Sequence, residues 1–277
     1  METNVWALAG TGLLAGFIGS LLGLGGGIFV VPLLTLALGV PIQSAIGTSL
    51  VGVAATSSTA SITYLRERLT NIRLAMVLES ATTMGAVLGA LLAVYLSQTF
   101  LAALFGCITV YTAYNMARRP RDKEASAQQS GKTVGTLTSS YYDRSQDRVV
   151  SYEVRRLPAG MGASVIAGAV SGMLGVGGGF IKVPVMNLVM SVPFKAAIAT
   201  SNLMVGITAV ASAFIYFYRG YVSPEVAAPV VIGICFGAWL GSKLAWRASG
   251  LILRRVFVIV LGAIAIMMFL KAAGTGI

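Results

Sequence analysis

The chain has 277 residues, of which 56% are hydrophobic and 10% are charged. A soluble domain carries about 25% charged residues, so this composition excludes an ordinary soluble protein. Apolar runs of about 20 residues, separated by short polar turns, are typical of an all-α, polytopic helical membrane protein. The runs are apolar on all sides, which excludes the alternating pattern of a membrane β-barrel.

The formal net charge is +11. The basic residues cluster at the ends of apolar segments and in one central loop, as expected for cytoplasmic loops beside anionic lipid. We therefore expect membrane lipid, and no nucleic acid, as a partner. The chain has no histidine, and Cys107 and Cys235 lie inside apolar runs, so we expect no metal site, no cofactor and no disulfide.

In chain order, residues 1–117 are predicted to form a first membrane repeat, residues 118–157 a polar loop and residues 158–277 a second membrane repeat. The predicted apolar segments are 5–38, 43–64, 72–96 and 100–117, then 158–190, 195–218, 224–247 and 254–271. Within the loop, β-branched and aromatic residues flank 143–147, which predicts a short β-hairpin.

A segment rich in glycine and proline occurs twice. Residues 16–49 and 168–201 align without a gap, and 15 of the 34 positions are identical. The shared residues include those that interrupt helices: Gly23 and Gly175, the triplets 25–27 and 177–179, and the prolines Pro32, Pro184, Pro41 and Pro193. A duplicated helix-breaking motif in an apolar sequence indicates the binding site of a transporter.

The first segment of each repeat is too long for one ordinary crossing. As a single helix, residues 5–38 would extend about 51 Å, against ~30 Å of hydrocarbon. Either this segment crosses once, or it is a re-entrant hairpin with its glycines near the midplane, which makes the two repeats inverted. If the first segments are re-entrant, only two of the cations at segment ends and in loops lie on the outer side of the membrane, namely Arg219 and Lys271. The positive-inside tendency favours this arrangement, with a cytoplasmic central loop and both termini outside.

Our candidate anion site consists of two glycine triplets: Gly25, Gly26 and Gly27, and Gly177, Gly178 and Gly179. Each glycine inside a helix costs about 1 kcal/mol relative to alanine, so three in a row should unwind it. Unwound backbone is tolerated in a membrane where protein buries it or where it faces a polar cavity. A helix that restarts there would point free N–H groups at an anion. The alternative is close helix packing, which is all we expect of four other glycines: Gly12, Gly16, Gly85 and Gly89.

Polar side chains follow each motif within the membrane. They are Thr48 and Ser49 in the first repeat and Thr200, Ser201 and Asn202 in the second. Their hydroxyl and amide groups could donate hydrogen bonds to the oxygens of an anion. The alternative is ordinary hydrogen bonding between or within helices.

Two charges lie inside apolar segments. Lys182 follows Gly179 by three residues, and we expect it to attract the anionic substrate; the alternative is a lysine that snorkels to the interface. Glu79 is a candidate carrier of a coupling proton, because burial disfavours an ionised carboxylate. The alternative is that Glu79 pairs with a basic group such as Arg73 or Lys182.

The paired Leu-Gly-x-Gly-Gly-Gly sequences, each followed by Val-Pro, resemble the sulfite exporter TauE/SafE family. They occupy residues 22–27 with Val31 and Pro32, and residues 174–179 with Val183 and Pro184. The resemblance covers essentially the whole chain. It implies a multi-pass inner-membrane protein that moves small sulfur-containing anions, such as sulfite or organosulfonates, usually by export.

We therefore expect an exporter, not an enzyme, that exposes a central site alternately to the two sides of the membrane. The alternatives are a proton- or sodium-coupled importer of another small anion, a membrane-embedded enzyme and a non-transporting scaffold. The lack of histidine and of a recognisable nucleophile–base pair disfavours the enzyme. The duplicated interruptions disfavour a scaffold, and a homo-oligomer is compatible with the sequence.

Overall fold

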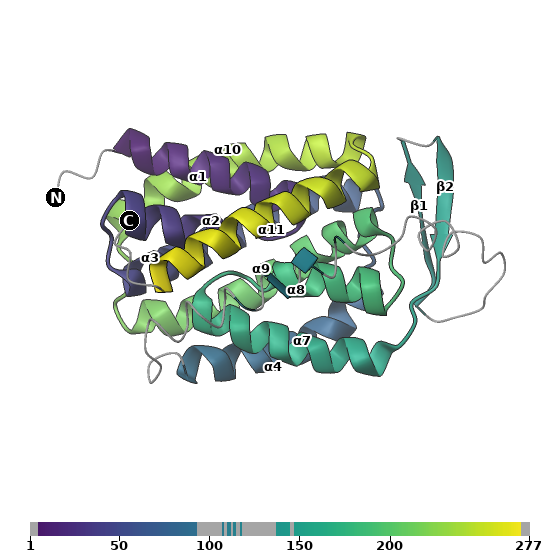
Figure 1. Ribbon diagram of the computed structural model, residues 1–277, viewed down its shortest axis with the longest axis horizontal. Helices are drawn as coiled ribbons and strands as arrows, with labels where there is room; N and C mark the ends of the chain where they lie inside the picture. The colour runs from purple at the N-terminus through teal and green to yellow at the C-terminus, as the bar shows by residue number, and fades with distance from the viewer. Residues whose placement is uncertain are drawn as a thin grey trace.

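The computed structural model of the chain describes residues 5–92, 107, 110–111, 113–114, 117, 137–144 and 147–272. This part of the chain is mainly helical (Figure 1). Its long helices are α1 (Val5–Leu22), α3 (Ile42–Arg66), α4 (Ile72–Leu92), α7 (Leu157–Leu174), α9 (Phe194–Tyr218), α10 (Pro224–Arg247) and α11 (Gly250–Ala272). Six helices of the described part are long and apolar enough to cross a membrane, namely α1, α3, α4, α7, α9 and α10. The prediction of a polytopic helical membrane protein is confirmed.

Short helical elements lie between the long ones. They are α2 (Gly27–Pro32) with the π-helical turn η1 (Leu33–Ala37), and α8 (Gly179–Pro184) with the π-helical turn η3 (Val185–Val189). A proline at the end of each short helix lacks a backbone N–H, which accounts for the change of hydrogen-bond pattern at that point. Most of the predicted segment 100–117 lies outside the described residues.

The bounds of the helices recur along the chain. The elements α1, α2, η1, α3 and α4 begin 152 residues before α7, α8, η3, α9 and α10 respectively. The backbone conformation is also repeated at matching positions where the side chains differ, since φ is +62° at Gly39 and +60° at Ser191. The chain therefore folds twice into the same succession of elements.

The six helices that are long and apolar enough to cross a membrane form three layers (Figure 1). Helix α1 packs along α10 on one side, α4 packs along α7 on the other, and α3 and α9 lie in contact between these two pairs. Glycines allow the outer pairs to approach closely: a Cβ on Gly16 would lie 2.4 Å from the carbonyl oxygen of Ile234, and one on Gly89 would lie 2.0 Å from that of Ala169. Gly12 and Gly85 make the same kind of contact, so the prediction of close packing at these four glycines is confirmed.

A β-hairpin lies at one end of the helices (Figure 1). Its antiparallel strands are β1 (Ser139–Asp143) and β2 (Arg148–Tyr152), which confirms the hairpin predicted around residues 143–147. Side chains of both strands are buried in the main hydrophobic core. A buried ion pair of 2.7 Å joins Asp143 at the end of β1 to Lys195 at the start of α9. The hairpin is therefore docked on the helices by apolar burial and by one ion pair.

Candidate functional site

Two loops, residues 23–27 and 175–179, follow the ends of α1 and α7, and we call them the glycine loops. Each loop leads into a short helix, α2 or α8. The positive φ angles are +73° at Gly23, +76° at Gly25 and +81° at Gly26, then +69° at Gly175, +76° at Gly177 and +70° at Gly178. A residue with a Cβ rarely adopts this left-handed conformation, so both loops depend on glycine at these positions.

The two glycine loops touch each other although they are far apart in the sequence. A Cβ on Gly27 would lie 2.6 Å from the carbonyl oxygen of Gly175, and a Cβ on Gly179 would lie 2.1 Å from that of Gly23. Each loop thus packs directly on the first residue of the short helix in the other repeat. Any side chain at these two positions would push the loops apart.

A pair of valines covers the glycine loops. A Cβ on Gly25 or on Gly177 would come within 2.5 Å of a methyl group of Val205 and 2.9 Å of one of Val53. Val53 on α3 and Val205 on α9 are 152 residues apart, and both are fully buried. The same two side chains therefore close both loops on this side.

The glycine loops carry unpaired backbone donors. The N–H groups of both glycine triplets, residues 25–27 and 177–179, have no hydrogen-bond acceptor within the described part of the chain. Backbone pairing resumes with the N–H of Phe29, which donates to the carbonyl of Gly26 at 3.0 Å, and with that of Ile181, which donates to the carbonyl of Gly178 at 3.1 Å. Buried N–H groups without acceptors are rare in proteins, and a cluster of them is suited to binding an anion.

The serines of the duplicated Thr-Ser pairs hold the glycine loops in place. The hydroxyl of Ser201 on α9 donates to the carbonyl oxygen of Gly23 at 2.9 Å. The hydroxyl of Ser49 on α3 donates to the carbonyl oxygen of Gly175, also at 2.9 Å. Each serine binds the loop of the other repeat, so the pair fastens the two repeats together at the loops.

The structure separates the other predicted polar residues. The amide Nδ2 of Asn202 donates to the carbonyl of Ser20 at 3.1 Å, beside the first glycine loop. The hydroxyl of Thr200 instead accepts a hydrogen bond from the backbone N–H of Asn71, before the start of α4, at 3.0 Å. The Thr48 hydroxyl is buried and has no partner among the described residues. Of the five predicted residues, Ser49, Ser201 and Asn202 therefore reach a glycine loop or the helix end before it.

Lys182 and Glu79 form a buried ion pair. Nζ of Lys182 lies 3.4 Å from Oε2 of Glu79, and the two residues are only 2% and 4% exposed. The hydroxyl of Thr208 donates to Oε1 of Glu79 at 2.5 Å and accepts a hydrogen bond from Nζ of Lys182 at 2.9 Å. Lys182 does not snorkel to a surface, and Glu79 pairs with it rather than with Arg73.

The ion pair occurs in only one of the two otherwise matching halves. The residues 152 positions from Lys182 and Glu79 are Val30 and Val231. The counterpart of Thr208 is Thr56, whose hydroxyl donates to the carbonyl of Gly52 within its own helix. The duplicated fold therefore does not require these charges at this position.

Sequence reasoning missed three residues that complete the site. Thr208 joins the ion pair, and two tyrosines bind carbonyls in the helix turns that precede the glycine loops. The hydroxyl of Tyr64 donates to the carbonyl of Ser20 at 2.8 Å, and that of Tyr216 to the carbonyl of Gly172 at 3.5 Å. The sequence signal was that the two tyrosines occupy matching positions, 152 residues apart, in the two repeats. A carbonyl at the end of a helix has no partner within that helix and needs a donor from elsewhere.

The polar groups around the glycine loops define what the site can bind. Within the described residues, no group of three or more His, Cys, Asp or Glu side chains is placed to hold a metal ion. The polar groups near the glycine loops are backbone N–H groups, hydroxyls, one amide and the ion pair. Such a set can bind and release an oxyanion through hydrogen bonds.

Residues 8–268 match the sulfite exporter TauE/SafE family. The chain belongs to the TauE/SafE family. It is 25% identical over 260 residues to "Probable membrane transporter protein YunE" of Bacillus subtilis (strain 168), covering 90% of this chain and 93% of that protein. It is 31% identical over 261 residues to "Probable membrane transporter protein" of Xylella fastidiosa (strain Temecula1), covering 93% and 92%.

No solved structure gives a significant match to the chain. Membership of the TauE/SafE family and the six apolar helices make this protein a multi-pass membrane transporter. The resemblance seen in the sequence motif is confirmed over nearly the whole chain.

Proposed function

We propose that the protein exports small sulfur-containing anions, such as sulfite or organosulfonates, across the inner membrane. The observation that carries this proposal is the pair of touching glycine loops, in which both triplets present N–H groups without an acceptor. Sulfite and sulfonate oxygens are hydrogen-bond acceptors that such donors can bind without a side-chain charge. The site is the two triplets, with Ser49, Ser201 and Asn202 holding the surrounding backbone.

The ion pair of Lys182 and Glu79 controls the net charge beside this site. Lys182 follows the second glycine triplet by three residues, and Glu79 balances its charge while the site is empty. A proton on Glu79 would cancel the carboxylate charge and leave Lys182 as an unbalanced cation beside the anion. Anion binding would then be coupled to protonation. This observation also favours the second candidate function, a proton-coupled importer of another small anion.

We further propose that the repeats, residues 1–117 and 158–277, are inverted and that each begins with a re-entrant element. In Figure 1, α1 begins at the end of the molecule opposite the hairpin, whereas α7 begins beside the hairpin. Helix α3 also begins far from the hairpin, because Gly47 lies against Tyr221 in the turn between α9 and α10. The segment from α1 through the first glycine loop to the start of α3 thus returns to the end of the molecule where α1 begins.

In this orientation the hairpin and the loop of residues 118–157 face the cytoplasm, as the clustering of basic residues favours. An inside-negative potential then favours the exit of an anion by about 2.3 kcal/mol per charge per 100 mV. Alternating access follows if the two halves rock about the glycine loops. The buried Val53 and Val205 are the contact that must open to let an anion reach the loops.

The test is transport by the purified full chain in liposomes. Flux of labelled sulfite, sulfoacetate, taurine and sulfate is followed with and without a pH gradient. We expect saturable flux of a sulfur-containing anion, its loss in Gly178→Leu, and its retention in Gly162→Leu, because Gly162 has no neighbour within 4 Å of its Cβ position. Absence of flux of all four compounds through folded protein would refute the assignment of the cargo.

A further inference from the structure

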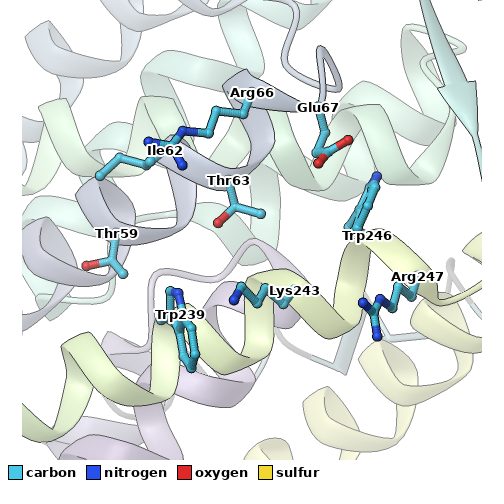
Figure 2. A pocket seen from close by; sticks show the side chains of 9 residues that line it. All are labelled: Thr59, Ile62, Thr63, Arg66, Glu67, Trp239, Lys243, Trp246 and Arg247. Carbon is cyan, nitrogen blue, oxygen red and sulfur yellow. The ribbon is translucent and has the colours of Figure 1, made fainter.

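A pocket of about 340 Å³ opens between the ends of α3 and α10, away from the glycine loops. Figure 2 shows Arg66 and its neighbours on one helix and Trp239, Lys243, Trp246 and Arg247 on the other. Arg66 and Arg247 are the last residues of their helices. The pocket therefore lies at the C-terminal ends of both helices, next to the hairpin, whose Arg144 contacts Trp246.

The pocket concentrates positive charge without a matching negative charge. Arg66, Lys243 and Arg247 line it together with a single carboxylate, that of Glu67. None of these four takes part in an ion pair among the described residues. The ammonium of Lys243 lies 3.7 Å from the ring centre of Trp239, which holds it at the pocket wall. Three exposed cations around one cavity favour an anionic occupant.

The hairpin adds a fourth cation at the same place. The guanidinium of Arg144, which follows β1, lies 4.1 Å from the ring centre of Trp246. Trp246 in turn lines the pocket. The hairpin thus extends the positive surface around the opening of the pocket.

The wall of the pocket that lies further from the helix ends is apolar, and its side chains are exposed at the surface of the protein. Ile62 is 56% exposed and Trp239 is 48% exposed. Thr59, at the inner end of the α3 wall, is seven residues from Arg66, or about 10 Å along a helix. A small soluble anion would bind the cations but leave this apolar wall uncovered. A phospholipid would place its phosphate at the cations and the start of an acyl chain against the wall.

The matching positions in the other repeat lack the basic residues that line this pocket. The residues 152 positions from Ile62 and Arg66 are Phe214 and Tyr218, and those 152 positions before Trp239 and Lys243 are Val87 and Leu91. All four lie on α9 or α4 and are exposed. The duplicated fold therefore forms without these cations, so they are not explained by folding alone.

From these observations we propose that the pocket binds the phosphate headgroup of an anionic phospholipid. A lipid bound there contacts both α3, which carries Ser49 and Val53, and α10, which packs along α1. It would thereby stabilise the α3–α10 contact, where the hydroxyl of Ser242 donates to that of Thr63 at 3.2 Å. The proposal does not depend on which anion is transported.

The tryptophans of the protein provide a direct test. The chain has three, and Trp6 lies in α1, near its start, outside the pocket. In a Trp6→Phe background, all tryptophan fluorescence comes from Trp239 and Trp246, which both line the pocket. The protein is placed in nanodiscs with increasing fractions of phosphatidylglycerol or phosphatidylcholine that carry bromine on their acyl chains, which quenches nearby tryptophan.

We expect half-maximal quenching at a lower fraction of brominated phosphatidylglycerol than of brominated phosphatidylcholine. Removing pocket cations in Arg66→Gln/Arg247→Gln should weaken this preference by about fivefold per cation. The matched control is Arg68→Gln/Arg255→Gln, which removes the same charge from two exposed arginines that do not line the pocket. The control should retain most of the preference.

Three results would overturn the proposal. The first is equal quenching by the two lipids in the Trp6→Phe protein. The second is an unchanged preference in the pocket variant. The third is loss of the preference on addition of millimolar inorganic phosphate or sulfite, which would assign the pocket to a soluble anion. Circular dichroism and size-exclusion chromatography of each variant establish that the proteins compared are folded.

Discussion

Nζ of Lys182 and Oε2 of Glu79 lie 3.4 Å apart inside the protein, although 103 residues separate them in the chain. The pair joins α8, which follows the second glycine loop, to α4. An ion pair in a buried position contributes little net stability, because removal of both charges from water offsets their attraction. Only one half of the duplicated fold carries the pair, so the fold does not require it.

Removing one partner should destabilise the protein more than removing both. Lys182→Met leaves the Glu79 carboxylate buried without its cation, which costs about 3–5 kcal/mol. Lys182→Met/Glu79→Met replaces the pair by apolar side chains and should recover most of the lost stability. Thermal unfolding of both variants in detergent measures this difference.

A transport measurement distinguishes an ion pair that only supports the structure from one that takes part in transport. We expect Lys182→Met/Glu79→Met to be stable but to transport poorly, because the site has lost its cation. A stable double variant with wild-type flux would show that the pair plays no part in transport.

Adding one methyl group at a glycine loop should disturb both loops. A Cβ on Gly179 would lie 2.1 Å from the carbonyl oxygen of Gly23. We therefore expect Gly179→Ala to lower both flux and the unfolding temperature. Gly10→Ala is the matched control, since nothing lies within 4 Å of its Cβ position, and alanine in a helix is more favourable than glycine by about 1 kcal/mol. Equal effects of the two substitutions would contradict the close contact.

The serine that holds the first glycine loop can be tested in the same way. Ser201→Ala leaves the carbonyl of Gly23 without its donor, and an unsatisfied buried acceptor costs about 1–3 kcal/mol. Ser58→Ala is the control, because the Ser58 hydroxyl is exposed and donates to the carbonyl of Ala54 in its own helix. Thermal unfolding should drop only for Ser201→Ala. A similar drop in both would mean that the bond between the repeats adds nothing.

The hairpin should loosen when its buried ion pair is broken. In Asp143→Asn the ammonium of Lys195 remains buried without its carboxylate, which favours undocking of the hairpin. Hydrogen exchange at the backbone amides of β1 and β2 should become faster. Glu153→Gln is the control, because its ion pair with Arg155 is 3.9 Å long and partly exposed and is worth at most about 1 kcal/mol. Unchanged exchange in Asp143→Asn would show that apolar burial alone docks the hairpin.

Local features of the sequence were enough to predict a set of long apolar helices and the hairpin. The predicted segment at 224–247 has the bounds of α10, and that at 43–64 is two residues shorter than α3 at its C-terminal end. Glycine permits left-handed backbone conformations that other residues rarely adopt, and proline fixes φ and lacks a backbone N–H, so both effects act at the residue itself and do not depend on distant contacts. The close packing at Gly16 and Gly89 was predicted because small residues let neighbouring helices approach closely.

The partners of the polar side chains could not be predicted in this way. Thr48, Thr200 and Asn202 were grouped with the serines by their spacing, yet Thr200 binds the backbone of Asn71 and only Asn202 reaches a helix end beside a loop. Glu79 had two candidate basic partners in the sequence, Arg73 and Lys182. The partner that it binds depends on how α8 packs against α4 and α9.

The sequence by itself predicted the apolar spans and the family to which the chain belongs. The side of the membrane that the basic residues favour stays a prediction. Hydropathy, backbone preference and charge act locally, so they can be read along the chain. Only the tertiary structure decided that the two glycine loops touch, that each serine binds the loop of the other repeat, and that the ends of α3 and α10 form a basic pocket. Those contacts join residues more than 100 positions apart, and their geometry exists only once the helices are packed.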